Sequence, residues 1–297
     1  MEFITNNQIG TNGRLANQLF QYAVLLVFSK IHNVKIKIPI IKTNNKYKRF
    51  RLDEIFNLKY EILDDSDKIL GTYNEKSENF DENIYKLGFS YKNKGNINLN
   101  GWFQSVKYFE NFNIHIHKQF QIKNEILLKA KNIYKSYKKN DEIIIALHIR
   151  LGDYLSDFNK LIRINVGNNK FIELFKNYFE KKYKNCKFLI ISDDIKWCKN
   201  NLNTYKNFIY SDNSDIIDFC LLTLSDNLVV SPSTFGWWAF YLNQNAKEVF
   251  LPNKWWRPEK TGIVCNFYKK KYTDLKYEFY PKNKTYKLYN PINFTVL

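Results

Sequence analysis

The chain has little glycine, little proline and few cysteines for its length. Its 297 residues include 10 Gly, 6 Pro and 4 Cys. Disordered segments are enriched in Gly and Pro, so this shortage indicates a chain that folds. The cysteines show no C-x-x-C or other metal-binding spacing, which favours a reduced, cytosolic protein over a disulfide-bonded or zinc-binding one. They are Cys186, Cys198, Cys220 and Cys265.

Long apolar segments and acidic residues are also scarce. No apolar run is long enough to cross a bilayer, and the first residues lack the basic and apolar regions of a signal peptide. Only 29 acidic residues oppose 46 basic ones, a net charge of +17. This balance favours nucleic acid, a membrane surface or a phosphorylated substrate as partner. The lysines are scattered along the sequence, which is typical of a solvated surface.

Common catalytic motifs are missing as well. There is no P-loop, no G-x-G-x-x-G and no G-x-S-x-G. The histidines His32, His115 and His117 show neither a triad nor a metal pattern. Enzymes that depend on those motifs are therefore excluded.

The order of predicted elements is that of an α/β protein. The first half predicts a strand at 3–4, a helix over 15–31 and a strand over 34–38, and further on a strand over 97–101 and a long helical pattern over 111–137. Residues 40–95 are polar and irregular. The second half predicts strands over 143–149, 188–191, 207–210, 228–230 and 248–251, alternating with helices over 170–184, 195–201, 216–224 and 235–243.

Such alternation is typical of a doubly wound parallel sheet. We therefore expect two Rossmann-like domains with a cleft between them. The expected boundaries are an acceptor-side domain over 1–140, a nucleotide-sugar-binding domain over 141–280 and a tail over 281–297.

The segment that ends the predicted strand 143–149 is the first candidate site. His148, Arg150 and Asp153 follow each other within six residues, where a buried apolar run turns polar. Ligands of open α/β sheets bind at the carboxyl ends of the strands, and this basic cluster suits an anion such as a nucleotide diphosphate. The alternative is a strand that simply ends in a polar loop.

Two further strand ends carry polar residues. Ser233 or Thr234 is predicted to cap the helix over 235–243, where unpaired N–H groups and the helix dipole could hold a phosphate. The alternative is an ordinary capped helix. Asp193 and Asp194 could bind a divalent metal, but capping of the helix over 195–201 is the preferred interpretation because no further ligand cluster is apparent.

Five motifs in the right order make the chain resemble the α1,2-fucosyltransferases, and its C-terminal half resembles the blood-group-H type. The matching segments are Gly13-Arg14-Leu15-Ala16-Asn17-Gln18, Gly101 to Phe109, His148-Ile149-Arg150-Leu151-Gly152-Asp153-Tyr154, Trp197-Cys198 and Asp218 to Leu242. Two positions depart from the family pattern. Ala16 replaces a Gly, and Leu151 replaces a second Arg, so that Arg either serves structure in the family or is compensated here by a residue such as Arg14.

The resemblance implies a GT-B-type fold of two facing Rossmann-like domains, with the active site in the cleft. It implies inverting transfer of L-fucose from GDP-L-fucose to the 2-hydroxyl of a terminal β-galactoside, with no metal or other cofactor. A first motif that begins at Gly13 leads us to expect a cytoplasmic enzyme without a membrane anchor, which could sit near anionic membranes or lipid-linked glycans. A protein O-fucosyltransferase-like enzyme and, further off, a basic nucleic-acid-binding protein are the alternatives.

The resemblance also assigns roles to residues. Arg150 would hold the diphosphate with its bidentate guanidinium, and Asp153 would be either the catalytic base or a structural salt-bridge partner. Asp218 would accept hydrogen bonds from guanine, the alternative being a helix N-cap. The remaining donor-side residues would be His148 at the guanosine and Ser233, Thr234 and Phe235 at the diphosphate. Arg14, Asn17 and Gln18 would form a cleft loop that contacts the acceptor or the donor sugar.

Overall fold

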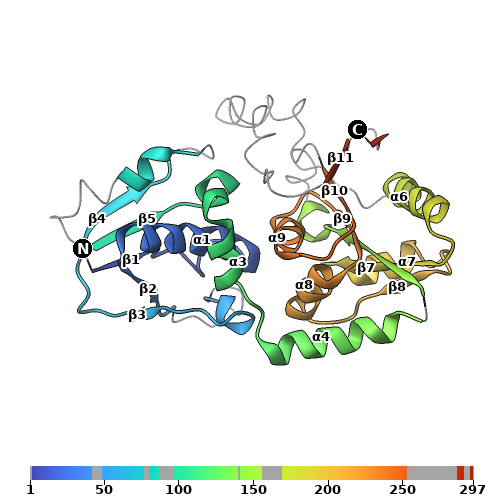
Figure 1. The fold of residues 1–297 in the computed structure, drawn as a ribbon, viewed down its shortest axis with the longest axis horizontal. Coiled ribbons are helices and arrows are strands. Elements are labelled where there is room, and N and C mark those ends of the chain that lie inside the picture. The colour runs from blue at the N-terminus through green and yellow to red at the C-terminus, as the bar shows by residue number, and fades with distance from the viewer. Residues whose placement is uncertain are drawn as a thin grey trace. The chain divides into compact units, whose positions relative to one another are not determined.

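The computed structural model describes residues 2–41, 49–76, 80–86, 96–139, 141–155, 169–252, 286–290 and 295–296. The protein divides into two compact units, the first holding the described residues up to Lys123 and the second those from Asn124 onward. Each unit has a sheet of its own, flanked by helices (Figure 1). The predicted α/β class is therefore confirmed.

The first unit is built on a five-stranded sheet in the order β3-β2-β1-β5-β4, in which all neighbours are parallel. Its strands are β1 (Phe3–Thr5), β2 (Lys35–Pro39), β3 (Glu61–Leu63), β4 (Ile69–Asn74) and β5 (Asn96–Asn100). Its helices are α1 (Leu15–His32) and α3 (Asn113–Gln119), with short 3-10 turns η1 (Leu52–Glu54), η2 (Glu82–Lys86), η3 (Val106–Tyr108) and η4 (Glu110–Phe112). The predicted strands at 3–4, 34–38 and 97–101 are confirmed.

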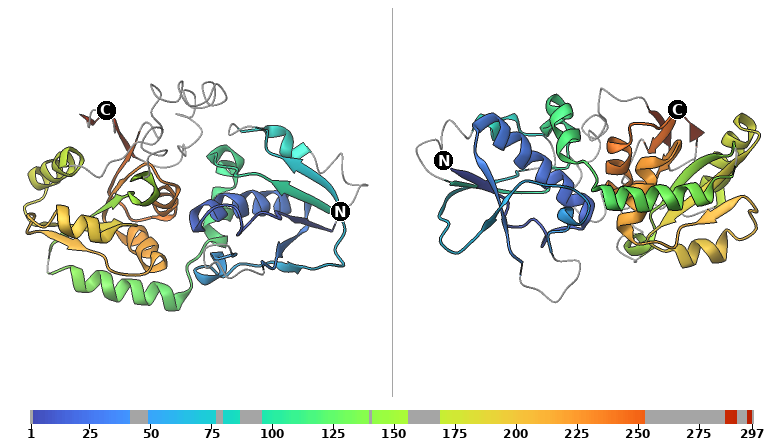
Figure 2. Two further views of the ribbon diagram at one scale, coloured as in Figure 1. Left: turned by 180° about the vertical axis from the view of Figure 1, so that it is seen from behind. Right: turned by 60° about the horizontal axis from the view of Figure 1, so that its bottom comes forward.

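Helix α1 is the main buried helix of this unit. It lies against β1 and β2 (Figure 2), and almost every residue from Leu15 to Phe28 is buried. The helix ends at Asn33, which adopts a left-handed conformation with φ 52° and donates its N–H to the Ser29 carbonyl. Because apolar residues cover most of its circumference, α1 is held firmly in the core. The loop that leads into α1 is therefore anchored at the end where the helix begins.

The second unit is built on a seven-stranded sheet in the order β12-β11-β10-β9-β6-β7-β8. Its strands are β6 (Ile143–Ile149), β7 (Cys186–Ser192), β8 (Phe208–Tyr210), β9 (Asn227–Val230), β10 (Glu248–Pro252), β11 (Lys287–Asn290) and β12 (Thr295–Val296). Its helices are α4 (Asn124–Tyr137), α6 (Asn169–Lys182), α7 (Ile195–Asn201), α8 (Asp215–Leu224) and α9 (Thr234–Leu242), with one 3-10 turn, η5 (Gly152–Leu155). All neighbours are parallel except β11 and β12. The predicted alternation of this half is confirmed.

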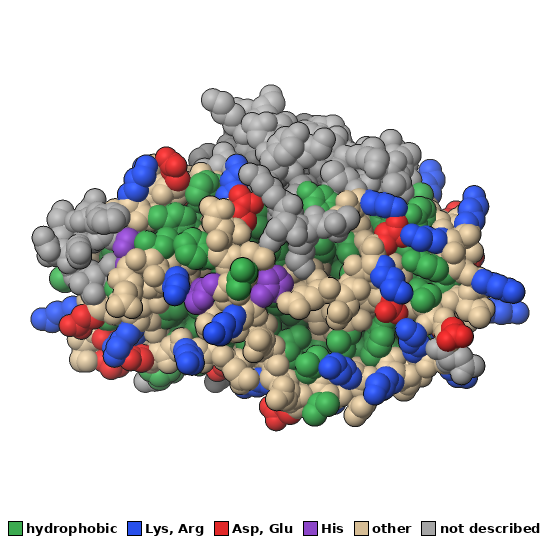
Figure 3. Space-filling view, in the orientation of Figure 1, with side chains coloured by type: hydrophobic (Ala, Val, Ile, Leu, Met, Phe, Trp, Pro, Cys, Tyr) green, Lys and Arg blue, Asp and Glu red, His purple; other side chains and the backbone are tan. Residues whose placement is uncertain are grey.

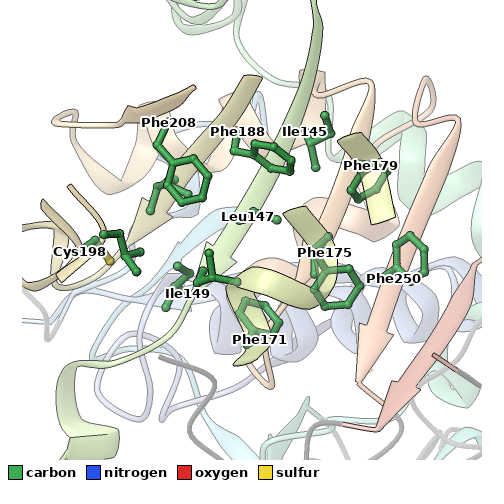
Figure 4. Close-up of a cluster of buried hydrophobic side chains, with 14 of the residues drawn as sticks. Ile145, Leu147, Ile149, Phe171, Phe175, Phe179, Phe188, Cys198, Phe208 and Phe250 are labelled. Atoms are coloured by element: carbon green, nitrogen blue, oxygen red, sulfur yellow. The ribbon is translucent and has the colours of Figure 1, made fainter. Parts of the chain in front are cut away.

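Strand β6 is the centre of the second core. Every second residue, Ile145, Leu147 and Ile149, joins a cluster with the buried phenylalanines of α6 (Figure 4). Leu151, which stands where the family pattern has Arg, is fully buried in the same cluster. A side chain at this position therefore faces the core, which favours a structural role for the residue that occupies it.

The boundary between the units lies earlier than the predicted one at residue 140. The helical pattern over 111–137 is broken at 120–123, where Ile122 bridges to Phe56 and the Lys123 N–H bonds to the Ile55 carbonyl at 2.8 Å. Helix α4 then runs beside α8 (Figure 2) and joins the second unit. Its Tyr134 hydroxyl lies 3.2 Å from Asp226 Oδ2, a contact that periodicity in the sequence cannot predict.

The described part of the expected tail also belongs to the second unit. Strand β11 pairs in parallel with β10, and β12 pairs with β11 in the opposite direction. The Lys287 ammonium binds the carboxylate of Glu248, which is 7% exposed. These residues extend the sheet instead of forming a separate tail.

The positively charged side chains are dispersed over the surface, as the scattered lysines in the sequence predict. On the face drawn in Figure 3, Lys and Arg side chains lie singly or in small groups, with Asp and Glu between them. Within the described ranges, no helix is long and apolar enough to cross a membrane.

Candidate active site

The second sheet has a topological switch point between β6 and β9. From β6 the chain proceeds to β7 and β8 on one side, and β9 and β10 lie on the other. At a switch point, the loops that follow two neighbouring strands run in opposite directions and leave a crevice between them. Ligands of open α/β sheets bind in this crevice, at the carboxyl ends of the strands. His148 pairs in register with Val230, so the loops after these two residues emerge side by side.

Hydrogen bonds join the two loops. The Ser231 N–H donates to the His148 carbonyl at 3.2 Å, and the Arg150 N–H donates to Ser231 Oγ at 3.0 Å. Ser231 Oγ also lies 2.9 Å from His148 Nδ1, and the Tyr154 hydroxyl donates to the Pro232 carbonyl at 2.8 Å. The sequence-predicted His148 and Arg150 are therefore held together by Ser231, a residue that we did not predict as part of the site.

His148 is a neutral, immobilised side chain. It is 3% exposed, and burial together with the charge of Arg150 lowers its pKa to about 3. Its ring stacks on Phe235, with 5.7 Å between centroids. A Cβ at Gly236 would lie 2.7 Å from His148 Nδ1, so a glycine lets α9 approach the imidazole this closely. An imidazole that stays neutral at physiological pH can orient a ligand by hydrogen bonding, but it adds no positive charge.

Arg150 supplies the positive charge. Its side chain is 17% exposed, and its Nη1 lies 2.5 Å from Asp193 Oδ2. Its Nη2 contacts Asp153 Oδ1, so the salt bridge that was the alternative to a base role for Asp153 is present. The Tyr154 ring lies beneath the guanidinium, 5.4 Å from Cζ to the ring centroid. Arg150 is thus fixed at the sheet edge by two carboxylates and an aromatic ring.

The two carboxylates of the 193–194 pair have different roles. Asp194 caps α7, accepting from the Trp197 N–H at 3.0 Å, as predicted. Asp193 does not cap: it accepts from the Leu151 N–H at 2.8 Å and binds Arg150. A Cβ at Gly152 would lie 2.1 Å from Asp193 Oδ2, so glycine is required for this approach. Sequence reasoning missed this role because both acids fit the same turn.

Helix α9 begins at the same edge. Ser233 is its N-cap and accepts from the Phe235 N–H at 3.3 Å, whereas Thr234 is the first helical residue. Phe235 and Gly236 of its first turn lie against His148, so the N-terminus of α9 adjoins this residue. Its N–H groups and dipole add partial positive charge where an anion would bind.

Asp218 lies deeper in the unit. It is 7% exposed and accepts a hydrogen bond from the Ser211 hydroxyl. Its pKa is raised to about 7, mainly by burial. The negative charges of Asp215 and Asp212 also raise this pKa, whereas the hydrogen bond from Ser211 lowers it. The residue that caps α8 is Ser214, and Asp218 lies within the first turn of that helix, so the N-cap alternative is wrong, whereas the predicted helix over 216–224 is confirmed to within one residue. Its neighbour Phe219 contacts Phe235 edge-on, at 5.4 Å between centroids, which connects Asp218 to the site.

The predicted cleft loop belongs to the first unit. Arg14 occupies the N-cap position of α1 and is exposed, and Asn17 Oδ1 accepts from Gln104 Nε2 at 3.0 Å. Gln18 is fully buried. Its Nε2 donates to the Arg49 carbonyl and its Oε1 accepts from the Arg51 N–H, both at 2.9 Å. Gln18 therefore holds the 49–51 segment against α1 and does not present its amide to a ligand.

Within the described ranges, no three His, Cys, Asp or Glu side chains are grouped as a metal site. What the site does offer is one arginine, one neutral histidine and a capped helix N-terminus around a switch point. This combination defines a class: Rossmann-like proteins that bind the phosphates of a nucleotide-linked ligand.

Comparison of the sequence with known families narrows that class. Glycosyl transferase family 11 matches residues 2–276, so the chain belongs to this family and is a glycosyltransferase. The resemblance noted in the motifs is thereby confirmed.

Individual relatives and one solved structure agree with this assignment. The chain is 26% identical to an α-1,2-colitosyltransferase of Escherichia coli, covering 84% of this chain and 91% of the relative. It is 23% identical to the galactoside 2-α-L-fucosyltransferase SEC1 of Bos taurus, covering 87% and 74%. The structure of POFUT1 in complex with GDP-fucose superposes with a TM-score of 0.57 at 11% identity, covering 84% and 96%. This last similarity shows the fold and confirms the GT-B-type pair of Rossmann-like units.

Proposed function

We propose that the protein is an inverting galactoside α1,2-fucosyltransferase that uses GDP-β-L-fucose and needs no metal. The observation that carries the proposal is the group at the β6–β9 switch point, in which Arg150, His148 and the first turn of α9 surround one place suited to a diphosphate. Family membership supports the sugar transfer, and the activity of the fucosyltransferase relative supports fucose and galactoside as substrates.

The chemistry follows from the leaving group. As the bond between fucose C1 and the β-phosphate oxygen breaks, negative charge grows on GDP and the sugar becomes oxocarbenium-like. The acceptor 2-hydroxyl oxygen bonds to C1 from the opposite face and gives its proton to a general base, for which Asp153 is the candidate. This converts the β-linked donor into an α-linked product. Positive charge that is already in place at the diphosphate stabilises this transition state more than the ground state.

The two carboxylates together outweigh the positive charge of Arg150, so Arg150 stabilises a diphosphate best if the diphosphate replaces one of them. Asp193 is the more buried partner, with a side chain that is 23% exposed, and its other oxygen holds the Leu151 N–H. The Asp153 side chain is 49% exposed. We therefore assign Asp193 as the permanent partner and Asp153 as the one that gives up its place on Nη2 to the diphosphate.

Colitose is a second candidate for the transferred sugar, because one relative is a colitosyltransferase with 26% identity. Colitose is fucose without its 3-hydroxyl, so the two donors would share the GDP contacts. Transfer to protein, the alternative raised by the sequence, is less well supported, because the similarity to POFUT1 concerns the fold alone.

The deciding experiment is a donor screen in EDTA. GDP-fucose, GDP-colitose, GDP-mannose and UDP-galactose are each incubated with lactose, and the linkage of any product is determined by NMR. We expect an α1,2-fucosyl product whose yield does not change with the chelator. Preference for GDP-colitose, a linkage to another hydroxyl, or activity that returns only with Mn²⁺ or Mg²⁺ would each contradict the corresponding part of the proposal.

We further propose that the enzyme works in the cytoplasm and uses its net charge of +17 to associate with anionic lipid surfaces. In fractionated cells it should appear in the soluble pool at moderate salt and sediment with anionic vesicles only at low salt, because exposed charges are screened as ionic strength rises. A pool that resists carbonate extraction would contradict this expectation.

A further inference from the structure

The first unit has a topological switch point of its own. Its sheet order β3-β2-β1-β5-β4 places β1 between β2, which follows it in the chain, and β5, which comes much later. The loop after β1 leads to α1, and the loop after β5 begins at Gly101. By the same rule that locates the site in the second unit, a ligand is expected where these two loops diverge.

An exposed aromatic side chain occupies this position. Trp102 is 36% exposed, whereas the next residue, Phe103, is fully buried. The N–H groups of both residues donate to Glu75 Oε2, at 2.7 and 3.1 Å, and Phe103 adopts a left-handed φ of 51°. A bulky residue rarely adopts that conformation, so the surrounding contacts fix this turn and with it the direction of Trp102.

The loop after β1 approaches the indole closely. Gly13 has φ +86°, and a Cβ at this position would lie 2.7 Å from Trp102 Cζ3. Asn17, in the first turn of α1, accepts from Gln104 Nε2 at 3.0 Å, so the two loops also share an amide pair beside the ring. The side chains of Asn17 and Gln104 thus place an amide pair beside the exposed Trp102, while the Glu75 carboxylate holds its backbone.

Buried polar atoms without a hydrogen-bond partner lie at the same end of the sheet. Among the described residues these include Thr5 Oγ1 and Asn6 Nδ2, at the carboxyl end of β1, and Gln21 Oε1. Gln21 Nε2 donates to the Gly101 carbonyl at 3.1 Å, which places this amide directly under the Trp102 turn. Polar groups left unsatisfied at such a position are costly unless water or a ligand hydroxyl completes them.

We propose that Trp102 is the platform on which the terminal sugar of the acceptor lies, with the amides of Asn17 and Gln104 at its hydroxyls. One face of a β-galactoside is lined by ring C–H groups and packs on an indole, while its hydroxyls need hydrogen-bond donors and acceptors, both of which an amide supplies. This inference rests on the proposed galactosyl acceptor. In this proposal the acceptor binds at the switch point of the first unit, and the donor binds at the switch point of the second unit.

The test compares Trp102→Ala with Trp102→Phe, and uses Leu70→Ala as matched control. Leu70 lies on β4 of the same unit and is 64% exposed. For each protein we would measure the KM for lactose, the Kd for GDP, the hydrolysis of GDP-fucose without acceptor, and lactose binding by NMR titration. Trp102→Ala should raise the KM and the Kd for lactose at least tenfold, equivalent to about 1.4 kcal/mol. Phe should restore most of the affinity, and GDP binding and hydrolysis should stay unchanged.

The outcomes separate this inference from the proposed function. Unchanged lactose binding in Trp102→Ala, or an equal loss in Leu70→Ala, overturns the platform even if fucose is transferred. If the wild-type protein neither hydrolyses nor transfers GDP-fucose, the proposed function fails, and the NMR titration still decides the platform. A variant that loses GDP binding together with lactose binding would indicate disrupted folding of the site and would also count against a specific role.

Discussion

Arg150→Lys is expected to lower kcat/KM for fucosyl transfer by roughly 100-fold or more, the range seen when one preorganised charge-stabilising group is removed. Lysine keeps the positive charge but presents one ammonium in place of a planar fork. In this site Nη1 binds Asp193 at 2.5 Å, so the diphosphate is expected on the side of Nη2, which Asp153 gives up. A lysine can serve Asp193 or the diphosphate, but it cannot hold both in fixed directions.

Two comparisons make this result specific. Arg51→Lys changes another buried arginine, which pairs with Glu54 at 3.1 Å in the first unit, and should leave kcat/KM nearly unchanged. Asp193→Asn should also lower the activity when it is made in the wild-type protein. It should lower the activity little further in the Arg150→Lys variant, because both substitutions disturb the same Arg150–Asp193 ion pair. An Arg150→Lys enzyme with wild-type kcat/KM and unchanged GDP affinity would show that Arg150 does not bind the diphosphate.

Strands β6 to β10 of the second unit could be predicted because they are short apolar runs in a parallel sheet. The segment over 143–149 is an example: β6 occupies the same residues, and six of its seven residues are buried. Parallel strands of this kind leave a clear pattern in the sequence, and their carboxyl ends were the right places to look for a site.

The boundary between the units could not be predicted in the same way. The helical period continues through residues 111–137, and the break at 120–123 depends on Ile122 and Lys123 meeting the 55–56 segment, which lies far away in the sequence. Tertiary contacts of this kind override local periodicity.

The sequence predicted which residues belong to the candidate site, but it did not predict the hydrogen bonds and ion pairs that join them. His148, Arg150 and Ser233 could be placed at strand ends or helix caps, and the structure puts them there. Asp193 could not be distinguished from Asp194 because both follow β7, and their roles differ only through contacts in the folded chain: Asp194 caps α7, whereas Asp193 reaches Leu151 and Arg150. Gln18 stands beside Arg14 and Asn17 in the motif, but the helical turn directs it into the core.

Asp218→Asn is expected to weaken GDP binding at least tenfold, or about 1.4 kcal/mol. The proposed role of Asp218 is to accept hydrogen bonds from the N1–H and the amino group of guanine, and asparagine replaces one of the two acceptor oxygens with a donor. The alternative in which Asp218 caps a helix no longer applies, because Ser214 is the cap of α8. Asp215 is an exposed acid in the first turn of the same helix, and its charge helps to raise the pKa of Asp218. Asp215→Asn is therefore the matched control at about pH 8, where Asp218 is largely ionised, and should bind GDP there like the wild type.

The raised pKa gives this prediction a pH dependence with a defined sign. With a pKa of about 7 in the folded protein, against the ordinary 3.8, Asp218 is largely protonated at weakly acidic pH. Only the carboxylate accepts both guanine hydrogen bonds, so GDP affinity should rise as the pH increases from about 6 to about 8. The stability changes in the opposite direction: burial favours the acid form, and this contribution is lost as the pH rises through about 7.

The Asn variant therefore separates ligand recognition from folding. Since asparagine cannot ionise, Asp218→Asn should match or exceed the wild-type Tm at about pH 8, while its GDP affinity is low and does not change with pH. Pyrophosphate, which lacks the base, should compete almost equally well for both proteins. Calorimetry of GDP binding at several pH values, together with thermal unfolding, measures these quantities. An Asn variant that binds GDP with wild-type affinity would exclude Asp218 as the residue that recognises guanine.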